Sequence, residues 1–140
     1  MLMLTSGQRD LVRDKGTILG RALIGLLFFM SGVSMALTGG ADYIASTIEF
    51  LGPLAIVVAW AAVLLKIVAG GAIIIGKRVG LASASLIVFI ILATVIAHMN
   101  WSDPTQITTT LKNLAIIGGL MYLMSYGPGG AHTTRLANHE

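Results

Sequence analysis

The stretch LAIVVAWAAVLLKIVAGGAIII, residues 54–75, decides the fold class of this chain. Lys66 is its only charged side chain, and no other strongly polar residue interrupts it. A helix needs about 20 predominantly apolar residues to cross the hydrocarbon core of a bilayer. The stretch therefore predicts a transmembrane helix.

Three further stretches are long and apolar enough for the same role. They are TILGRALIGLLFFMSGVSMAL (residues 17–37), VGLASASLIVFIILATVIAH (residues 79–98) and ITTTLKNLAIIGGLMYLMSY (residues 107–126), of which the last is the least apolar. Only 11% of the 140 residues are charged, against about 25% in soluble domains, which leaves too few charges to cover a water-facing surface. We predict an all-α, polytopic membrane protein with four transmembrane helices in a bundle.

The links between these spans carry turn signals. Gly76-Lys77-Arg78 predicts a tight turn that makes the second and third spans a helical hairpin. In the longer link, residues 38–53, apolar side chains recur at helical spacing, which predicts a short amphipathic helix at the membrane interface. These side chains are Tyr43, Ile44, Ile48 and Leu51. Gly52-Pro53 ends that helix, and Asp103-Pro104 is a start signal before the fourth span.

Lysines and arginines gather on one side of the predicted membrane. They lie before and just inside span one, between spans two and three, and after span four: Arg9, Arg13, Lys15, Arg21, Lys77, Arg78 and Arg135. By the positive-inside rule, both termini are expected in the cytoplasm. Residues 1–16 would form a cytoplasmic N-terminal segment and residues 127–140 a cytoplasmic tail. Arg21 is expected to reach back to lipid phosphates, and the net charge of +3 reflects these flanking residues and not nucleic-acid binding.

The composition excludes several chemistries. The chain has no cysteine, which removes disulfides, thiolate metal sites, iron–sulfur clusters and thiol redox chemistry. No Ser/His/Asp set can be argued, and no histidine pair has the spacing that a haem or a metal requires in a bundle. His132 and His139 of the tail have no supporting ligand beside them. We predict no catalytic residue and no metal site, so any redox work would need a borrowed cofactor.

Lys66 lies near the middle of its span, about 14 Å or more from either end at the helical rise per residue. A charged lysine at that depth costs roughly 2.5–3.5 kcal/mol on insertion scales, so the direction in which it faces matters. The residues three, four and seven positions away are mostly small, which is typical of helix–helix contacts in membranes. They include Ala59, Ala62, Val63, Ala69, Gly70 and Ile73. The lysine is therefore expected to face the bundle.

No Asp or Glu lies within a predicted span, so Lys66 has no ion-pair partner inside the membrane part of one chain. The partners that remain are Ser31, Ser34, Thr94, backbone carbonyls or a carboxylate of the 38–53 link. Another chain, a lipid phosphate or a ligand is also possible. Two interpretations stay open: a structural lysine held by hydroxyls and carbonyls, or a site for a ligand, a partner or a proton.

His98 and Asn113 are the other candidate polar contacts inside the bundle. His98 ends the third span at interfacial depth, where it is either an ordinary amphipathic residue or a contact for a proton or a quinone. Asn113 begins the strongly apolar part of the fourth span, where its amide could bond across helices.

Three segments of the chain carry a family resemblance. They are RALIGLLFFMSGVS (residues 21–34), GGAIIIGKRVGLASASLIVFIILATVIAHMNW (residues 70–101) and LKNLAIIGGLMYLMSYGPGG (residues 111–130). In this order they resemble the DoxX family of small bacterial membrane proteins, over about residues 20–130. The resemblance implies a four-helix membrane bundle and a loose association with membrane oxidoreductases, quinol oxidation among them.

The chain departs from the family pattern at two positions. The pattern usually has an acidic residue in span two just before its glycines, and a lysine in span one after its Ser-Gly. Lys66 and Met35 lie near those positions here, so an acid–base pair between the two helices would be broken and its sign reversed. Of the family-matched positions, His98 and Asn113 remain as candidates.

The leading hypothesis is a non-catalytic accessory or anchoring subunit of a membrane oxidoreductase or respiratory complex. Lys66, His98 and Asn113 are its candidate quinone or bundle-interior contacts, and its partners would be the bilayer and other membrane subunits or a second copy. One alternative is a small anion or solute carrier or channel subunit that uses Lys66. Another is a structural scaffold that packs through Gly16–Gly20 and the glycines of the fourth span.

Overall fold

The computed structural model describes residues 3–98 and 100–129 of the chain. Within these residues the chain forms five α-helices and one 3-10 turn, with no strand. The helices are α1 (Ser6–Leu37), α2 (Gly40–Thr47), α3 (Leu54–Ile75), α4 (Val79–Ala97) and α5 (Pro104–Tyr126), and the 3-10 turn is Glu49–Leu51. All except α2 are long and apolar enough to cross a membrane. The prediction of an all-α fold with four spans and a short helix between the first two is confirmed.

Two helices begin before the first residue of the predicted membrane span. α1 starts at Ser6 and not at residue 17, because Thr5 and Gln8 form a capping box in which each side chain accepts a hydrogen bond from the other residue's N–H. α5 starts at Pro104 and not at residue 107, because the Asp103 carboxylate accepts from the Thr105 N–H at 2.9 Å. Hydropathy marks where apolar residues begin, whereas these polar caps extend the helices into the flanking segments.

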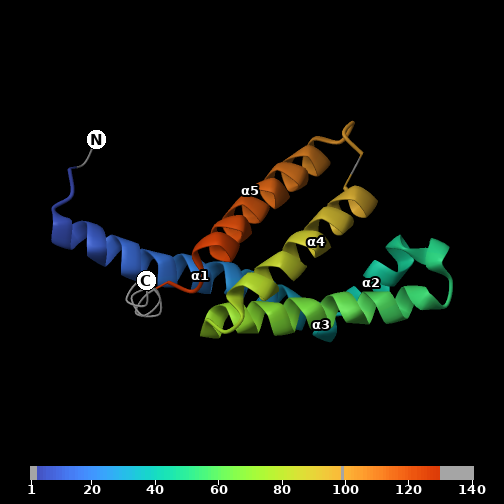
Figure 1. Ribbon diagram of the computed structural model, residues 1–140. Coiled ribbons are helices and arrows are strands. Elements are labelled where there is room, and N and C mark those ends of the chain that lie inside the picture. Colours follow the sequence, from blue (N-terminus) through green and yellow to red (C-terminus); the bar gives the residue numbers. More distant parts are fainter. Residues whose placement is uncertain (1–2, 99, 130–140) are drawn as a thin grey trace.

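α1 and α3 form the most extensive helix–helix contact of the molecule and lie side by side in Figure 1. Glycines allow their backbones to approach closely. A Cβ atom at Gly25 would lie 2.8 Å from the Gly70 carbonyl oxygen, and one at Gly70 would lie 2.6 Å from the Phe29 nitrogen. Small residues serve this purpose between membrane helices, so the α1–α3 pair is the base on which the other helices pack.

α2 and the 3-10 turn lie over one end of this pair. Ala41 and Ile48 are buried, and Ile44 packs against the cluster that includes Val63 of α3. Tyr43 is 73% exposed, so it does not share the packed face with Ile44. Adjacent residues of a helix point about 100° apart, and the packing against α3 selects Ile44.

α4 and α5 form a second pair, which joins α3 through the predicted turn at Gly76-Lys77-Arg78. Gly76 has a φ of +77°, a left-handed conformation that glycine adopts without a steric penalty. A core of Phe28, Ile73, Leu86, Leu120 and neighbouring residues lies where the helices meet. Away from this turn, the α4–α5 hairpin diverges from the α1–α3 pair (Figure 1).

Arg21 joins three segments at the end of the bundle that carries this turn. Its guanidinium donates hydrogen bonds to the Pro128 carbonyl at 2.6 Å and to the Ile74 carbonyl at 3.5 Å. Arg21 thus bonds to carbonyl groups at the ends of the helices, and its expected contact with lipid phosphates stays a prediction. Gly129 packs against Thr17, so the chain leaves the bundle at the end from which α1 enters it.

Candidate functional site

Lys66 lies on the face of α3 that packs against α1. The residue is 9% exposed. Its Nζ donates to Ser31 Oγ at 2.6 Å and to Met35 Sδ at 3.1 Å, both on α1, and it lies 5.8 Å from the centre of the Phe89 ring of α4. The lysine thus faces the bundle, and Ser31 is the one partner it uses among the hydroxyls that the sequence suggested.

All three partners of Lys66 are neutral. Within the described residues, the ion pairs join Arg13 to Asp10 and Asp14, and none involves Lys66. A hydroxyl, a thioether and an aromatic face therefore hold the ammonium group without cancelling its charge. Lys66 and Met35, the two departures from the DoxX pattern, are in direct contact.

A second set of polar side chains joins α4 to α5, at the end of this hairpin away from the α3–α4 turn. Asn113 Nδ2 donates to Thr94 Oγ1 at 2.8 Å. His98 Nδ1 lies 2.7 Å from Gln106 Oε1, and Thr110 Oγ1 donates to the His98 carbonyl at 3.1 Å. We call these five residues the α4–α5 seam.

The ends of the two helices place the seam. α4 ends at Ala97, and His98 closes its last turn by donating its N–H to the Thr94 carbonyl. On α5, the early start at Pro104 makes residue 106 helical, and the spacing i, i+4, i+7 puts residues 106, 110 and 113 on one face. Sequence analysis missed Gln106 and Thr110, although their spacing to Asn113 is the signal that could have revealed them.

A shallow groove of about 160 Å³ lies beside the seam. Its lining residues are Ile91, Thr94, Val95, Thr110, Asn113, Leu114 and Ile117, and the surface that they expose to the groove is apolar. Among the described residues, the Asn113 amide oxygen has no hydrogen-bond partner. The Gln106 oxygen that faces His98 Nδ1 requires a hydrogen on that nitrogen, so Nε2 is the free acceptor of the neutral ring.

The structure brings His98 and Asn113 together in the seam and leaves Lys66 apart from them. Lys66 contacts α1 and Phe89, and Thr94, which the sequence suggested as its partner, bonds to Asn113. No group of three or more His, Asp or Glu residues in the described ranges could hold a metal ion. His132, His139 and Arg135 lie outside these ranges.

A comparison with protein families identifies the relatives of this chain. The DoxX family model matches residues 16–99, which is more than half of the 140 residues. The chain belongs to the DoxX family. The match includes Lys66 and His98, whereas Asn113 and the rest of α5 lie beyond it. Comparisons with curated proteins and with solved structures gave no match. This DoxX-family protein, with its four apolar helices, is a multi-pass membrane protein.

Proposed function

We propose that this DoxX-family protein is a non-catalytic accessory subunit of a membrane oxidoreductase, and that a quinol head group binds in the groove beside the α4–α5 seam. The observation that carries the proposal is the groove itself, an apolar hollow lined in part by Asn113, whose amide oxygen has no hydrogen-bond partner among the described residues. A quinol presents hydroxyl donors on an apolar ring. Asn113 Oδ1 would accept one of these donors, and His98 Nε2 is a second acceptor at the end of the seam.

The size and exposure of the groove fit a ring whose tail remains in lipid. At about 160 Å³, it is smaller than most small-molecule sites, which enclose about 300–1,000 Å³. The side chains of Ile91, Val95 and Leu114, which form part of its wall, are about half exposed. The groove therefore opens toward the hydrocarbon. The isoprenoid tail of a quinol would continue along this apolar surface.

Electron transfer would take place on a partner subunit. The chain has no cysteine, and the seam supplies hydrogen-bonding groups that position a ring without exchanging electrons with it. Family membership supports this assignment because the resemblance implies association with membrane oxidoreductases. We expect the protein in the bacterial inner membrane with both termini in the cytoplasm.

Asn113→Leu tests the groove. Because this change removes both the free acceptor and the bond to Thr94, we expect a short-tailed quinol to bind at least tenfold more weakly to the protein in lipid nanodiscs, which corresponds to about 1.4 kcal/mol. Isothermal titration would measure the affinity. Ser85→Ala is the matched control, since the Ser85 hydroxyl donates only to the Ala82 carbonyl of its own helix.

Unchanged quinol affinity in Asn113→Leu would show that quinol does not bind in this groove. The subunit role is tested separately by native mass spectrometry of the protein extracted in a mild detergent. A co-isolated oxidoreductase subunit is the expected result. A protein that is isolated alone, with neither a partner subunit nor a quinone mass, would defeat the proposal.

A further inference from the structure

Lys66 is a buried cation with no counter-charge in the part of the chain that the structure describes. None of the acidic residues among residues 3–98 and 100–129 forms an ion pair with it. These residues are Asp10, Asp14, Asp42, Glu49 and Asp103. A buried charge is costly unless it is paired, so an ion that brings a negative charge to this position gains a favourable electrostatic interaction.

Lys66 and Ser31 together offer two kinds of hydrogen-bond donor at one point of the α1–α3 contact. The ammonium group has three N–H bonds, and it donates to Ser31 Oγ at 2.6 Å and to Met35 Sδ at 3.1 Å. The Ser31 hydroxyl accepts the first of these bonds, and within the described residues its own hydrogen has no acceptor. An anion bound at this point would therefore accept from a charged and from a neutral donor.

Met35 is the partner of Lys66 that a ligand would displace. A thioether is a weak acceptor, and the methionine side chain is flexible, whereas Ser31 Oγ accepts at a shorter distance. The centre of the Phe89 ring lies 5.8 Å from Nζ, and the face of such a ring attracts cations and repels anions. An anion is therefore expected on the α1 side of the ammonium group, in the place of the Met35 sulfur.

From this geometry we infer that Lys66 and Ser31 bind one small monovalent anion, of which chloride is the simplest example. The size limit follows from the packing, because a Cβ atom at Gly32 would lie only 2.7 Å from Ile67 and 3.1 Å from the Lys66 Cβ atom. The charge limit follows from the single net positive charge, since a divalent ion would leave an unpaired negative charge in its place. Lys66 contacts no residue of the α4–α5 seam, so anion binding is separate from the proposed quinol site.

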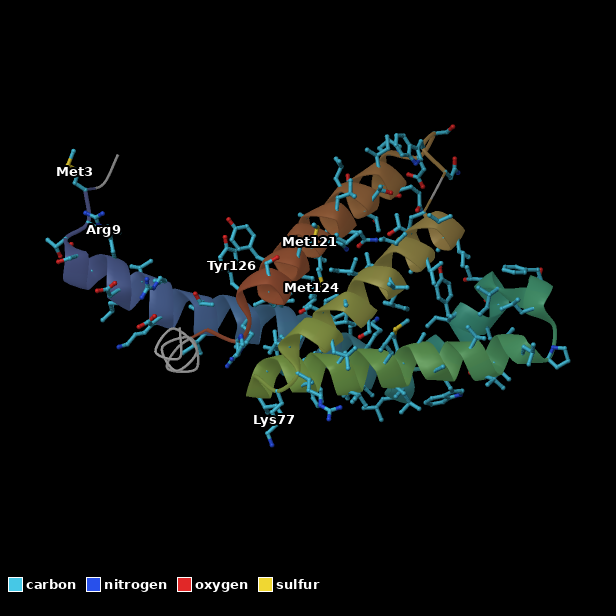
Figure 2. The ribbon with its side chains drawn as sticks, in the orientation of Figure 1. Met3, Arg9, Lys77, Met121, Met124 and Tyr126 are labelled. Atoms are coloured by element: carbon cyan, nitrogen blue, oxygen red, sulfur yellow. The ribbon has the colours of Figure 1, made fainter. Side chains whose placement is uncertain are left out.

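A chloride titration of the full chain, with isotopically labelled lysine and in nanodiscs of zwitterionic lipid, tests the site. Gluconate, which is too large to enter, keeps the ionic strength constant. The Lys66 Nζ resonance, identified by its loss in Lys66→Met, should shift with chloride and reach a plateau. Lys77 and Lys112 are exposed, and Figure 2 shows Lys77 pointing away from the helices at the α3–α4 turn. Their resonances are internal controls that should not reach a plateau.

Two variants of Met35 separate the effect of charge from that of shape. Met35→Glu supplies a carboxylate beside Lys66 from within the chain, so the chloride response of Lys66 should be lost. Met35→Gln, its uncharged counterpart of the same length, should retain a response that reaches a plateau. Ser31→Ala removes the second donor and should weaken chloride binding about tenfold, as expected for a hydrogen bond to a charged group.

The inference is overturned if the Lys66 resonance does not respond to chloride, or if Lys77 and Lys112 shift to the same extent, which would be a general effect of the ions. Tighter binding of sulfate than of chloride, or an unchanged chloride response in Met35→Glu, would also overturn it. If Met35→Glu does not fold, the comparison of the wild type with Ser31→Ala decides, since unchanged chloride affinity in that variant would place the anion elsewhere.

Discussion

Lys66 is a charged residue near the middle of a membrane helix whose partners are all neutral. Ser31 accepts a hydrogen bond from it, and Met35 and Phe89 cover the remaining sides of the ammonium group. Burying an ionised group is costly unless it is paired, and a single hydroxyl compensates only part of that cost. The net contribution of Lys66 to stability can therefore be small or negative, even though each of its contacts is well formed.

A pair of substitutions separates the charge from its hydrogen bond. Lys66→Met keeps the length of the side chain and removes the charge, so we expect the free energy of unfolding in mixed micelles to stay the same or to rise. Ser31→Ala leaves the ammonium group without its acceptor and should lower that free energy by about 1–3 kcal/mol. If Lys66→Met were as destabilising as Ser31→Ala, the lysine would be a net stabilising residue and this account of it would be wrong.

The orientation of Lys66 could be predicted from the sequence, but its partner could not. The small residues at helical spacing around it indicate the side of α3 that faces another helix. Choosing Ser31 over Ser34 requires the register of α1 on α3, which depends on contacts such as that of Gly32 with Ile67 and Lys66. Such contacts join residues far apart in the sequence, and no local pattern records them.

The α5 helix is the element in which local polar residues matter most. Its first turns carry Gln106 and Thr110 of the α4–α5 seam, and Gln106 is helical only because α5 starts at Pro104. Hydropathy predicts the apolar part of α5 and assigns these turns little weight, since they are polar. The sequence shows Asp103 as a helix start signal. That this start brings Gln106 into the seam can be seen only from the position of α4 beside α5.

The Asp103 cap makes the start of α5 sensitive to acid. The Thr105 hydroxyl and the Thr105 N–H both donate to its carboxylate, and these hydrogen bonds lower the pKa of Asp103. A lowered pKa in the folded protein means that the stabilisation is complete above the ordinary pKa of an aspartate and is lost as the pH falls through the lowered value. Hydrogen exchange of the Thr105 amide, normalised to its intrinsic rate, should therefore speed up several-fold in acid.

Two variants of Asp103 check the assignment. Asp103→Asn keeps an N-cap side chain that does not titrate, so exchange at Thr105 should become independent of pH over the same range. Asp103→Ala removes the cap and should show fast exchange at every pH. An acid-induced change that persists in Asp103→Asn would have to come from another group.

At the scale of the whole molecule, the number of spans follows from hydropathy. The divergence of the α4–α5 hairpin from the α1–α3 pair (Figure 1) does not. Crossing geometry depends on how side chains of neighbouring helices interlock, and here the closest interlock is the glycine contact of α1 with α3. The glycine contact of α1 with α3 and the hydrogen-bonded seam therefore lie in different parts of the molecule, joined by the core that includes Phe28, Ile73, Leu86 and Leu120.

Gly70→Ala tests this division. An added Cβ atom would lie 2.6 Å from the Phe29 nitrogen, so α1 and α3 would have to separate, and overpacking of this kind costs about 1–3 kcal/mol. Gly118→Ala is the matched control, because no atom lies within 4 Å of a Cβ there and alanine is favoured over glycine in a helix by roughly 1 kcal/mol. We expect Gly70→Ala to lower the free energy of unfolding and Gly118→Ala to leave it unchanged or raise it. Quinol binding should survive in both variants if the seam packs independently, whereas its loss in Gly70→Ala would show that the groove depends on the α1–α3 pair.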